Sequence, residues 1–144
     1  MSAGGLDRRA FLEGGVRAAV LAALASACGS LDLTAPTLDK EIVVKLADYP
    51  ALAQVGGVAR IDGANIPLAV ARLKDADFAA LSLVCPHAGT TVAWQDAADM
   101  FVCPLHGARF AIDGQWIGGQ PTSGLVDYPT TYDAGAGTLR ITPR

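Results

Sequence analysis

From Glu41 onward, hydrophobic residues fall into short runs that turn residues separate. The runs that we expect to form strands cover residues 42–46, 58–61, 66–73, 78–84, 100–102, 125–128 and 138–141. Asp62-Gly63-Ala64-Asn65 lies between two of them and is a hairpin signal. No window after residue 40 has the apolar stripe of an amphipathic helix. This pattern predicts an all-β domain, an antiparallel sandwich or barrel, over residues 41–144.

The first 27 residues have a different pattern. The polar stretch 2–13 contains Arg8–Arg9, and the stretch 18–27 is apolar apart from one serine. A positive region, an apolar run and a small-residue cleavage site are typical of a secretory signal, and this run is about half the roughly 20 residues that span a bilayer. The arginine pair makes residues 1–27 resemble a twin-arginine signal peptide, so we expect an exported, periplasmic protein. The alternative is a short amphipathic or buried helix.

Two kinds of cleavage fit the end of this segment. Ala25-Ser26-Ala27 is an A-x-A site, which would release a soluble domain. The same residues followed by Cys28 resemble a lipoprotein box, which would leave a lipid-modified Cys28 as a membrane anchor. Residues 28–40 show no periodicity and include Pro36, so we expect them to form a tether.

The composition fits one compact domain and narrows the possible functions. The chain has 144 residues, of which 51% are hydrophobic and 17% charged, so a disordered protein is excluded. Its formal net charge of −3 lacks the basic excess of a nucleic-acid-binding protein. The chain has three cysteines and two histidines, and with Cys28 set aside any metal site must draw on very few ligands.

These few residues lie close together in the sequence. Cys85-Pro86-His87 is followed, after 15 residues, by Cys103-Pro104-Leu105-His106-Gly107, and each group comes after a predicted strand. Two sulfur and two nitrogen ligands suit zinc or an iron–sulfur cluster. A zinc finger usually keeps like ligands together, whereas each of these two groups holds one Cys and one His. Two mixed groups of this kind fit a binuclear cluster with two His on one iron.

The pattern C-x-H followed by C-x-x-H resembles that of the Rieske iron–sulfur family, and the resemblance extends over roughly residues 40–144. It implies one [2Fe–2S] cluster per chain, held by loops at one tip of the domain, with no catalytic residue. Cys85 and Cys103 would bind the buried iron, and His87 and His106 the outer one. Residues 118–121 resemble the proline-bearing loop of the family that covers the cluster. The residues that would surround the ligands are Gly89, Leu105, Gly107, Ala108, Phe110 and Pro121.

The sequence departs from high-potential members of this family at four positions. Thr90 and Leu105 stand where those proteins have a disulfide, and Ala108 and Phe110 stand where they have Ser and Tyr hydroxyls. Hydrogen bonds to the cluster sulfurs stabilise the reduced state, so their loss lowers the potential. We expect a potential in the lower half of the Rieske range of about −150 to +300 mV.

The function that the resemblance implies is one-electron transfer outside the cytoplasm, between a protein donor and a protein acceptor. The first alternative is a subunit of a larger membrane or periplasmic oxidoreductase, of the quinol–cytochrome c or molybdenum oxidase type. A more remote alternative is a structural zinc domain. A self-contained Rieske oxygenase is excluded, because it needs a second iron site with two further His, and both His are already used.

Overall fold

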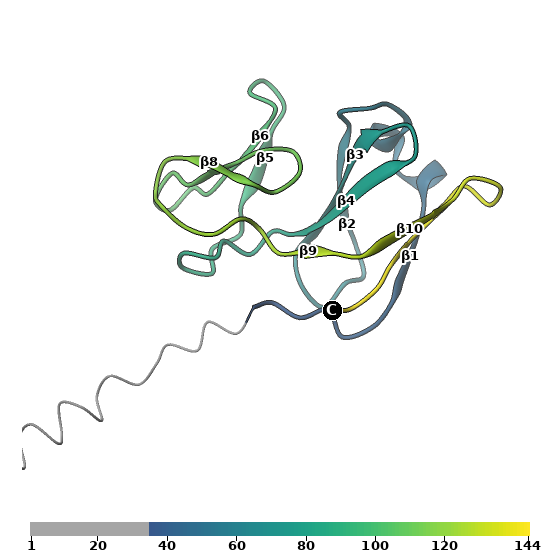
Figure 1. The fold of residues 1–144 in the computed structure, drawn as a ribbon, viewed down its shortest axis with the longest axis horizontal. Helices are drawn as coiled ribbons and strands as arrows, with labels where there is room; N and C mark the ends of the chain where they lie inside the picture. The colour runs from purple at the N-terminus through teal and green to yellow at the C-terminus, as the bar shows by residue number, and fades with distance from the viewer. Residues whose placement is uncertain (1–34) are drawn as a thin grey trace, which may run out of the picture. The chain divides into compact units, whose positions relative to one another are not determined.

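The computed structural model describes residues 35–144. The expectations for the signal peptide at residues 1–27, for its twin-arginine pair and for Cys28 lie outside that range. Within it, every regular element is a strand or a short 3-10 helix, and the sheets are antiparallel (Figure 1), so the prediction of an all-β fold is confirmed.

Eleven strands and two 3-10 helices follow one another in the described residues. They are β1 (Ile42–Lys45), η1 (Leu46–Asp48), η2 (Pro50–Ala53), β2 (Val58–Ile61), β3 (Leu68–Lys74), β4 (Asp77–Ser82), β5 (Ala93–Gln95), β6 (Met100–Val102), β7 (Arg109–Phe110), β8 (Trp116–Gly118), β9 (Asp127–Tyr128), β10 (Thr130–Asp133) and β11 (Thr138–Ile141). They form three sheets with the strand orders β1-β11-β10, β2-β3-β4-β9 and β5-β6-β7-β8.

Most predicted strands are present, with small differences at their ends. β2 and β3 pair across the predicted hairpin turn, where Gly63 has a φ of +82°. The first strand ends at Lys45 because a 3-10 turn begins at Leu46. The run predicted from residue 125 becomes a strand only over β9. The pattern did not predict β5, β7, β8 or β10, which have two to four residues.

The middle sheet, β2-β3-β4-β9, contributes to two separate cores. Side chains alternate across a strand, so Leu68 and Val70 of β3 face one core while Ala69 faces the other. Ala80 and Leu81 of β4 divide in the same way. Burial on both faces explains why this part of the sequence is almost continuously hydrophobic.

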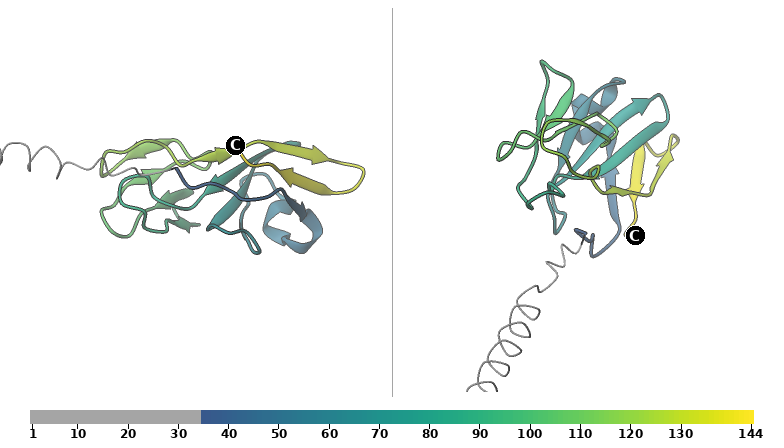
Figure 2. Two further views of the ribbon diagram at one scale, coloured as in Figure 1. Left: turned by 90° about the horizontal axis from the view of Figure 1, so that it is seen from below. Right: turned by 60° about the vertical axis from the view of Figure 1, so that its left-hand side comes forward.

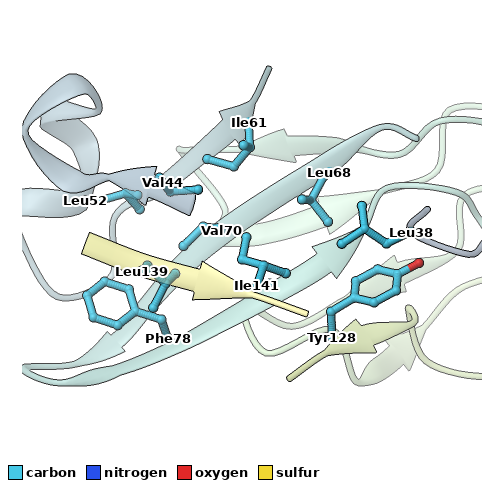
Figure 3. Close-up of a cluster of buried hydrophobic side chains, with 11 residues drawn as sticks. Leu38, Val44, Leu52, Ile61, Leu68, Val70, Phe78, Tyr128, Leu139 and Ile141 are labelled. Carbon is cyan, nitrogen blue, oxygen red and sulfur yellow. The ribbon is translucent and has the colours of Figure 1, made fainter. Parts of the chain in front are cut away.

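The first core lies between the middle sheet and the sheet β1-β11-β10 (Figure 3). The segment before β1 takes part in it, because Leu38 is only 3% exposed. Figure 3 shows Leu38 beside Tyr128, whose hydroxyl donates a hydrogen bond to the carbonyl of Pro36.

Asn65, in the turn between β2 and β3, also forms hydrogen bonds with the segment before β1. Its side-chain amide donates to the carbonyl of Thr37 at 2.9 Å, and its side-chain oxygen accepts the N–H of Asp39 at 3.1 Å. The tether predicted over residues 28–40 therefore includes four residues, 36–39, that pack on the domain.

The second core lies within and beneath the sheet β5-β6-β7-β8 and includes both cysteines. This sheet and its loops occupy one end of the domain, and the β10–β11 hairpin occupies the opposite end (Figures 1 and 2). Over residues 35–144, the structure contains no helix whose length and apolar character would let it cross a bilayer.

Candidate metal centre

The first cysteine-bearing loop leaves β4 and returns to β5 as a tight, hydrogen-bonded turn. Val84 and Thr91 form a β-bridge at its base. The N–H of Cys85 donates to the carbonyl of Thr90, and the N–H of Gly89 donates to the carbonyl of Cys85, both at 2.8 Å. Gly89 has a φ of +73°, a conformation that glycine adopts without steric cost. These bonds fix the backbone on both sides of His87.

The second loop, between β6 and β7, repeats this construction. The N–H of Cys103 donates to the carbonyl of Ala108 at 2.8 Å, and the N–H of Gly107 donates to the carbonyl of Cys103 at 3.0 Å. Gly107 has a φ of +72°. Each loop therefore places its glycine four residues after its cysteine in the same left-handed conformation, although the histidine is at the second position in one loop and at the third in the other.

The two cysteines lie beneath the loops in the second core. Both are free thiols and each is 1% exposed. Burial raises the pKa of the Cys85 thiol, and the neighbouring Cys103 thiol raises it further, while the backbone N–H of His87 acts in the opposite direction. Because a metal binds the thiolate, a bound cation would offset the negative charge that burial otherwise disfavours.

The two imidazoles face one another and are more exposed to solvent than the two thiols. Their Nδ1 atoms are 3.1 Å apart, and the rings cross at 83° with their centroids 4.8 Å apart. His87 is half-buried and His106 is exposed. A metal–imidazole bond is about 2.0–2.1 Å long, so two nitrogens at this separation can both reach one metal ion.

The donors thus form two pairs rather than one group. Among residues 35–144, no three or more His, Cys, Asp and Glu side chains gather around a point that could hold a single metal ion. A buried sulfur pair and a surface nitrogen pair match the donor set of a Rieske [2Fe–2S] cluster, with Cys₂ on one iron and His₂ on the other. The residues present fit that group.

The third loop, residues 118–121, packs directly against the second. Gly119 has a φ of +78°, and a Cβ on it would lie 1.8 Å from the carbonyl oxygen of Gly107. The indole N–H of Trp116 donates to the carbonyl of Gln120 at 3.0 Å and holds the loop from its own strand. Pro121, which the resemblance assigns to the cover of the cluster, is exposed.

The other residues expected around the ligands divide into buried and exposed positions. Ala108 and Phe110 are buried in the same core as both cysteines. Leu105 is 54% exposed, and Gly89 is exposed as well. Sequence reasoning missed the role of Gly119, since a contact between backbones leaves no periodic signal, although the glycine pair at 118–119 could have suggested a close approach.

Comparison with known proteins agrees with this geometry. The sequence profile described as "Rieske [2Fe-2S] domain" matches residues 42–129. The cytochrome b6-f complex iron-sulfur subunit of Chlorobaculum tepidum is 33% identical over 133 residues, which cover 90% of this chain and 72% of that protein. The same subunit of Chlorobaculum thiosulfatiphilum is 38% identical over 55 residues, which cover 38% of this chain and 30% of that protein.

Two solved structures share the fold. The cyanobacterial plasma membrane Rieske protein from Synechocystis superposes with a TM-score of 0.55 and 26% identity, covering 70% of this chain and 98% of that one. A hyperthermophilic respiratory Complex III chain gives a TM-score of 0.53 at 22% identity, covering 92% and 99% of the two chains, and supports the fold alone. From the matched profile, the similarity over nearly the whole sequence and the two donor pairs, we conclude that this chain belongs to the Rieske [2Fe–2S] family and carries one such cluster.

Proposed function

We propose that this protein transfers single electrons between two protein partners outside the cytoplasm, and that Cys85, His87, Cys103 and His106 hold its cluster. Membership of the Rieske family makes it an iron–sulfur electron carrier. The observation that supports the ligand assignment most directly is the 3.1 Å separation of the two histidine Nδ1 atoms, above two free and buried thiols. When bound, a [2Fe–2S] cluster accepts and releases one electron.

The cysteine side and the histidine side of this site differ in their exposure to solvent. Cys85 and Cys103 are nearly inaccessible, so water is excluded from the sulfur side. His106 is exposed and His87 half-buried, so an imidazole edge is available to a partner at the surface. Electron transfer between proteins is favoured where a ligand of the redox group lies at the contact surface, and the histidine side offers such a place.

The buried surroundings support a low-to-moderate potential. Ala108 and Phe110 pack in the core that contains both cysteines, and neither side chain carries a hydroxyl. Hydrogen bonds to the cluster sulfurs raise the potential because they stabilise the added negative charge. We therefore place the midpoint in the lower half of the range of about −150 to +300 mV.

The export assignment is supported by the sequence before the domain. Arg8–Arg9, the apolar run and Cys28 favour a twin-arginine signal and either a soluble periplasmic or a lipid-anchored domain. A similar solved protein is described as a plasma membrane Rieske protein. A lipid anchor on Cys28 would likewise attach this domain to a membrane.

A second function, as the Rieske subunit of a larger oxidoreductase, is favoured by one observation. The similarity to the cytochrome b6-f complex iron-sulfur subunit of Chlorobaculum tepidum extends over 90% of this chain. Of the larger assemblies considered, this similarity favours a quinol-oxidising complex over a molybdenum oxidase.

A redox titration of the mature protein, monitored by EPR, tests the proposal. A Rieske signal with a midpoint near or below zero would support a low-potential electron carrier. A clearly positive midpoint would show that other donors replace the missing hydroxyls and would favour the respiratory subunit. The absence of a signal from iron-loaded protein would contradict the ligand assignment.

A further inference from the structure

A groove lies between two edge strands, away from the histidine pair. β2 is the outer strand of the middle sheet and β5 the outer strand of the sheet that carries the second loop. A cavity of about 310 Å³ has Val58 and Arg60 of β2 on one side and Ala93 and Trp94 of β5 on the other. Buried apolar residues, among them Phe101, form its floor.

A second and larger cavity adjoins the first, because Val58 and Trp94 line both. It has a volume of about 660 Å³ and lies between residues 50–57, in η2 and the loop after it, and the hairpin of β5 and β6. Both volumes fall within the range of about 300–1,000 Å³ that is usual for ligand sites. The two cavities lie on either side of the shared residues Val58 and Trp94, and we call the pair the edge groove.

The backbone of β2 offers hydrogen bonds to an occupant of the edge groove. The N–H of Arg72 donates to the carbonyl of Gly57, and bonded positions alternate along an antiparallel pair. The backbone groups of Val58 and Arg60 therefore point away from β3, at the open edge of a strand whose residues line the groove. An unpaired edge of this kind is a template for an added extended segment.

The two ends of the edge groove carry opposite charge. Asp96 and Asp99 line the larger cavity, whose lining contains no basic residue, and Arg60 lines the smaller one, whose lining contains no acidic residue. The indole N–H of Trp94 donates to Asp96 at 2.8 Å and holds that carboxylate at the groove, with one oxygen left to accept another bond. Between the charged ends, Trp94 and Val58 present apolar surface.

We propose that the edge groove binds an extended segment of a partner protein, with a basic side chain beside Asp96 and Asp99, an apolar side chain against Trp94 and a carboxylate beside Arg60. This inference rests on the proposed electron-transfer function and adds to it a recognition surface separate from the histidines. A second copy of the chain is a poorer occupant, because residues 35–144 contain 8 basic and 11 acidic residues, so two copies repel.

Fluorescence anisotropy of a labelled peptide tests this inference on the cluster-loaded full chain. The probes are the pentapeptide Lys-Val-Leu-Val-Glu and its reversed order, because the groove does not dictate the direction of the added strand. At low ionic strength we expect saturable binding of at least one of them, weakened by salt. The double substitution Asp96→Asn with Asp99→Asn should weaken binding about fivefold.

The matched control is Asp75→Asn with Asp77→Asn, which removes one carboxylate from the turn after β3 and one from the first position of β4; neither residue lines the edge groove. We expect this control to bind as the unmodified chain does. Replacing the glutamate of the peptide by glutamine should weaken binding to the unmodified chain and have no effect on Arg60→Gln, since the two changes remove the same pair.

Three results would overturn the proposal: no saturable binding, equal weakening by both double substitutions, or a dimer of the chain that Asp96→Asn with Asp99→Asn dissociates. An EPR spectrum of each sample separates this inference from the proposed function. If the unmodified chain gave no Rieske signal but bound the peptide, the ligand assignment alone would be contradicted. A normal signal without peptide binding would contradict the edge groove alone.

Discussion

The carbonyl oxygen of Gly107 lies against the α-carbon of Gly119, at a distance that leaves no room for a side chain. A Cβ on Gly119 would be 1.8 Å from that oxygen. Gly107 follows His106 directly, so the third loop supports the backbone of the second loop beside one of its proposed ligands. The third loop thus contributes to the site by contact between backbones.

Gly119→Ala should therefore destabilise both the fold and the cluster. The φ of +78° costs about 1 kcal/mol or more for alanine, and the contact with Gly107 forces the two loops apart. We expect a lower unfolding midpoint in urea and faster loss of the visible cluster absorption. The control is Gly63→Ala, where φ is +82° and nothing lies within 4 Å of the added Cβ. Equal cluster loss in both variants would refute a specific role for the contact.

His106→Ala should abolish the Rieske EPR signal, because one of the two facing nitrogens is removed. Val43→Ala provides the control, since it shortens an exposed side chain in β1, outside the sheet and loops that carry the proposed ligands. We expect that control to keep the signal. An unchanged spectrum in His106→Ala would show that the outer iron has another ligand.

Ala108→Ser combined with Phe110→Tyr should raise the midpoint potential. One hydrogen bond that is stronger by about 1 kcal/mol in the reduced state corresponds to about 40 mV for a one-electron couple. The expected rise for the pair is thus on the order of 80 mV if both hydroxyls reach a sulfur. Ala136→Ser, in the turn between β10 and β11, is the control. A constant or lower midpoint in the double variant would exclude the explanation from missing donors.

Tyr128→Phe should cost about 1 kcal/mol in the free energy of unfolding at pH 8, because the carbonyl of Pro36 loses its donor. Burial raises the pKa of Tyr128, and Arg144 acts weakly in the opposite direction. With a folded-state pKa above the unfolded one, this group's stabilisation is fully present below about pH 10 and is lost as the pH rises through the folded-state value.

Urea unfolding at pH 8 and pH 11, followed by circular dichroism, checks both parts of that expectation. The unmodified chain should lose more stability between the two pH values than Tyr128→Phe does. Asn65→Ala, which removes two hydrogen bonds to the same segment and no titratable group, serves as the control and should show the same alkaline loss as the unmodified chain. A parallel loss in Tyr128→Phe would mean that another group causes it.

Local patterns were sufficient for most of the fold. Alternating and continuous apolar runs predicted β2, β3, β4, β6 and β11, because each is long enough, or hydrophobic enough, to be recognised from its own residues. β7 and β8 have two and three residues, and they are strands only because β6 and β7 lie beside them. Leu38 likewise looks like part of a tether until the first core surrounds it.

For the site, the residue types and their spacing along the sequence predicted the kind of cluster, which the family match confirms, because metal chemistry restricts which side chains can bind. The same spacing led us to propose Cys85, His87, Cys103 and His106 as its ligands. Tertiary structure alone decided that the two Nδ1 atoms face one another, that Gly119 supports the second loop and that β2 and β5 enclose a groove. Those relations join residues of different loops or of different strands, and no local pattern encodes the distance between them.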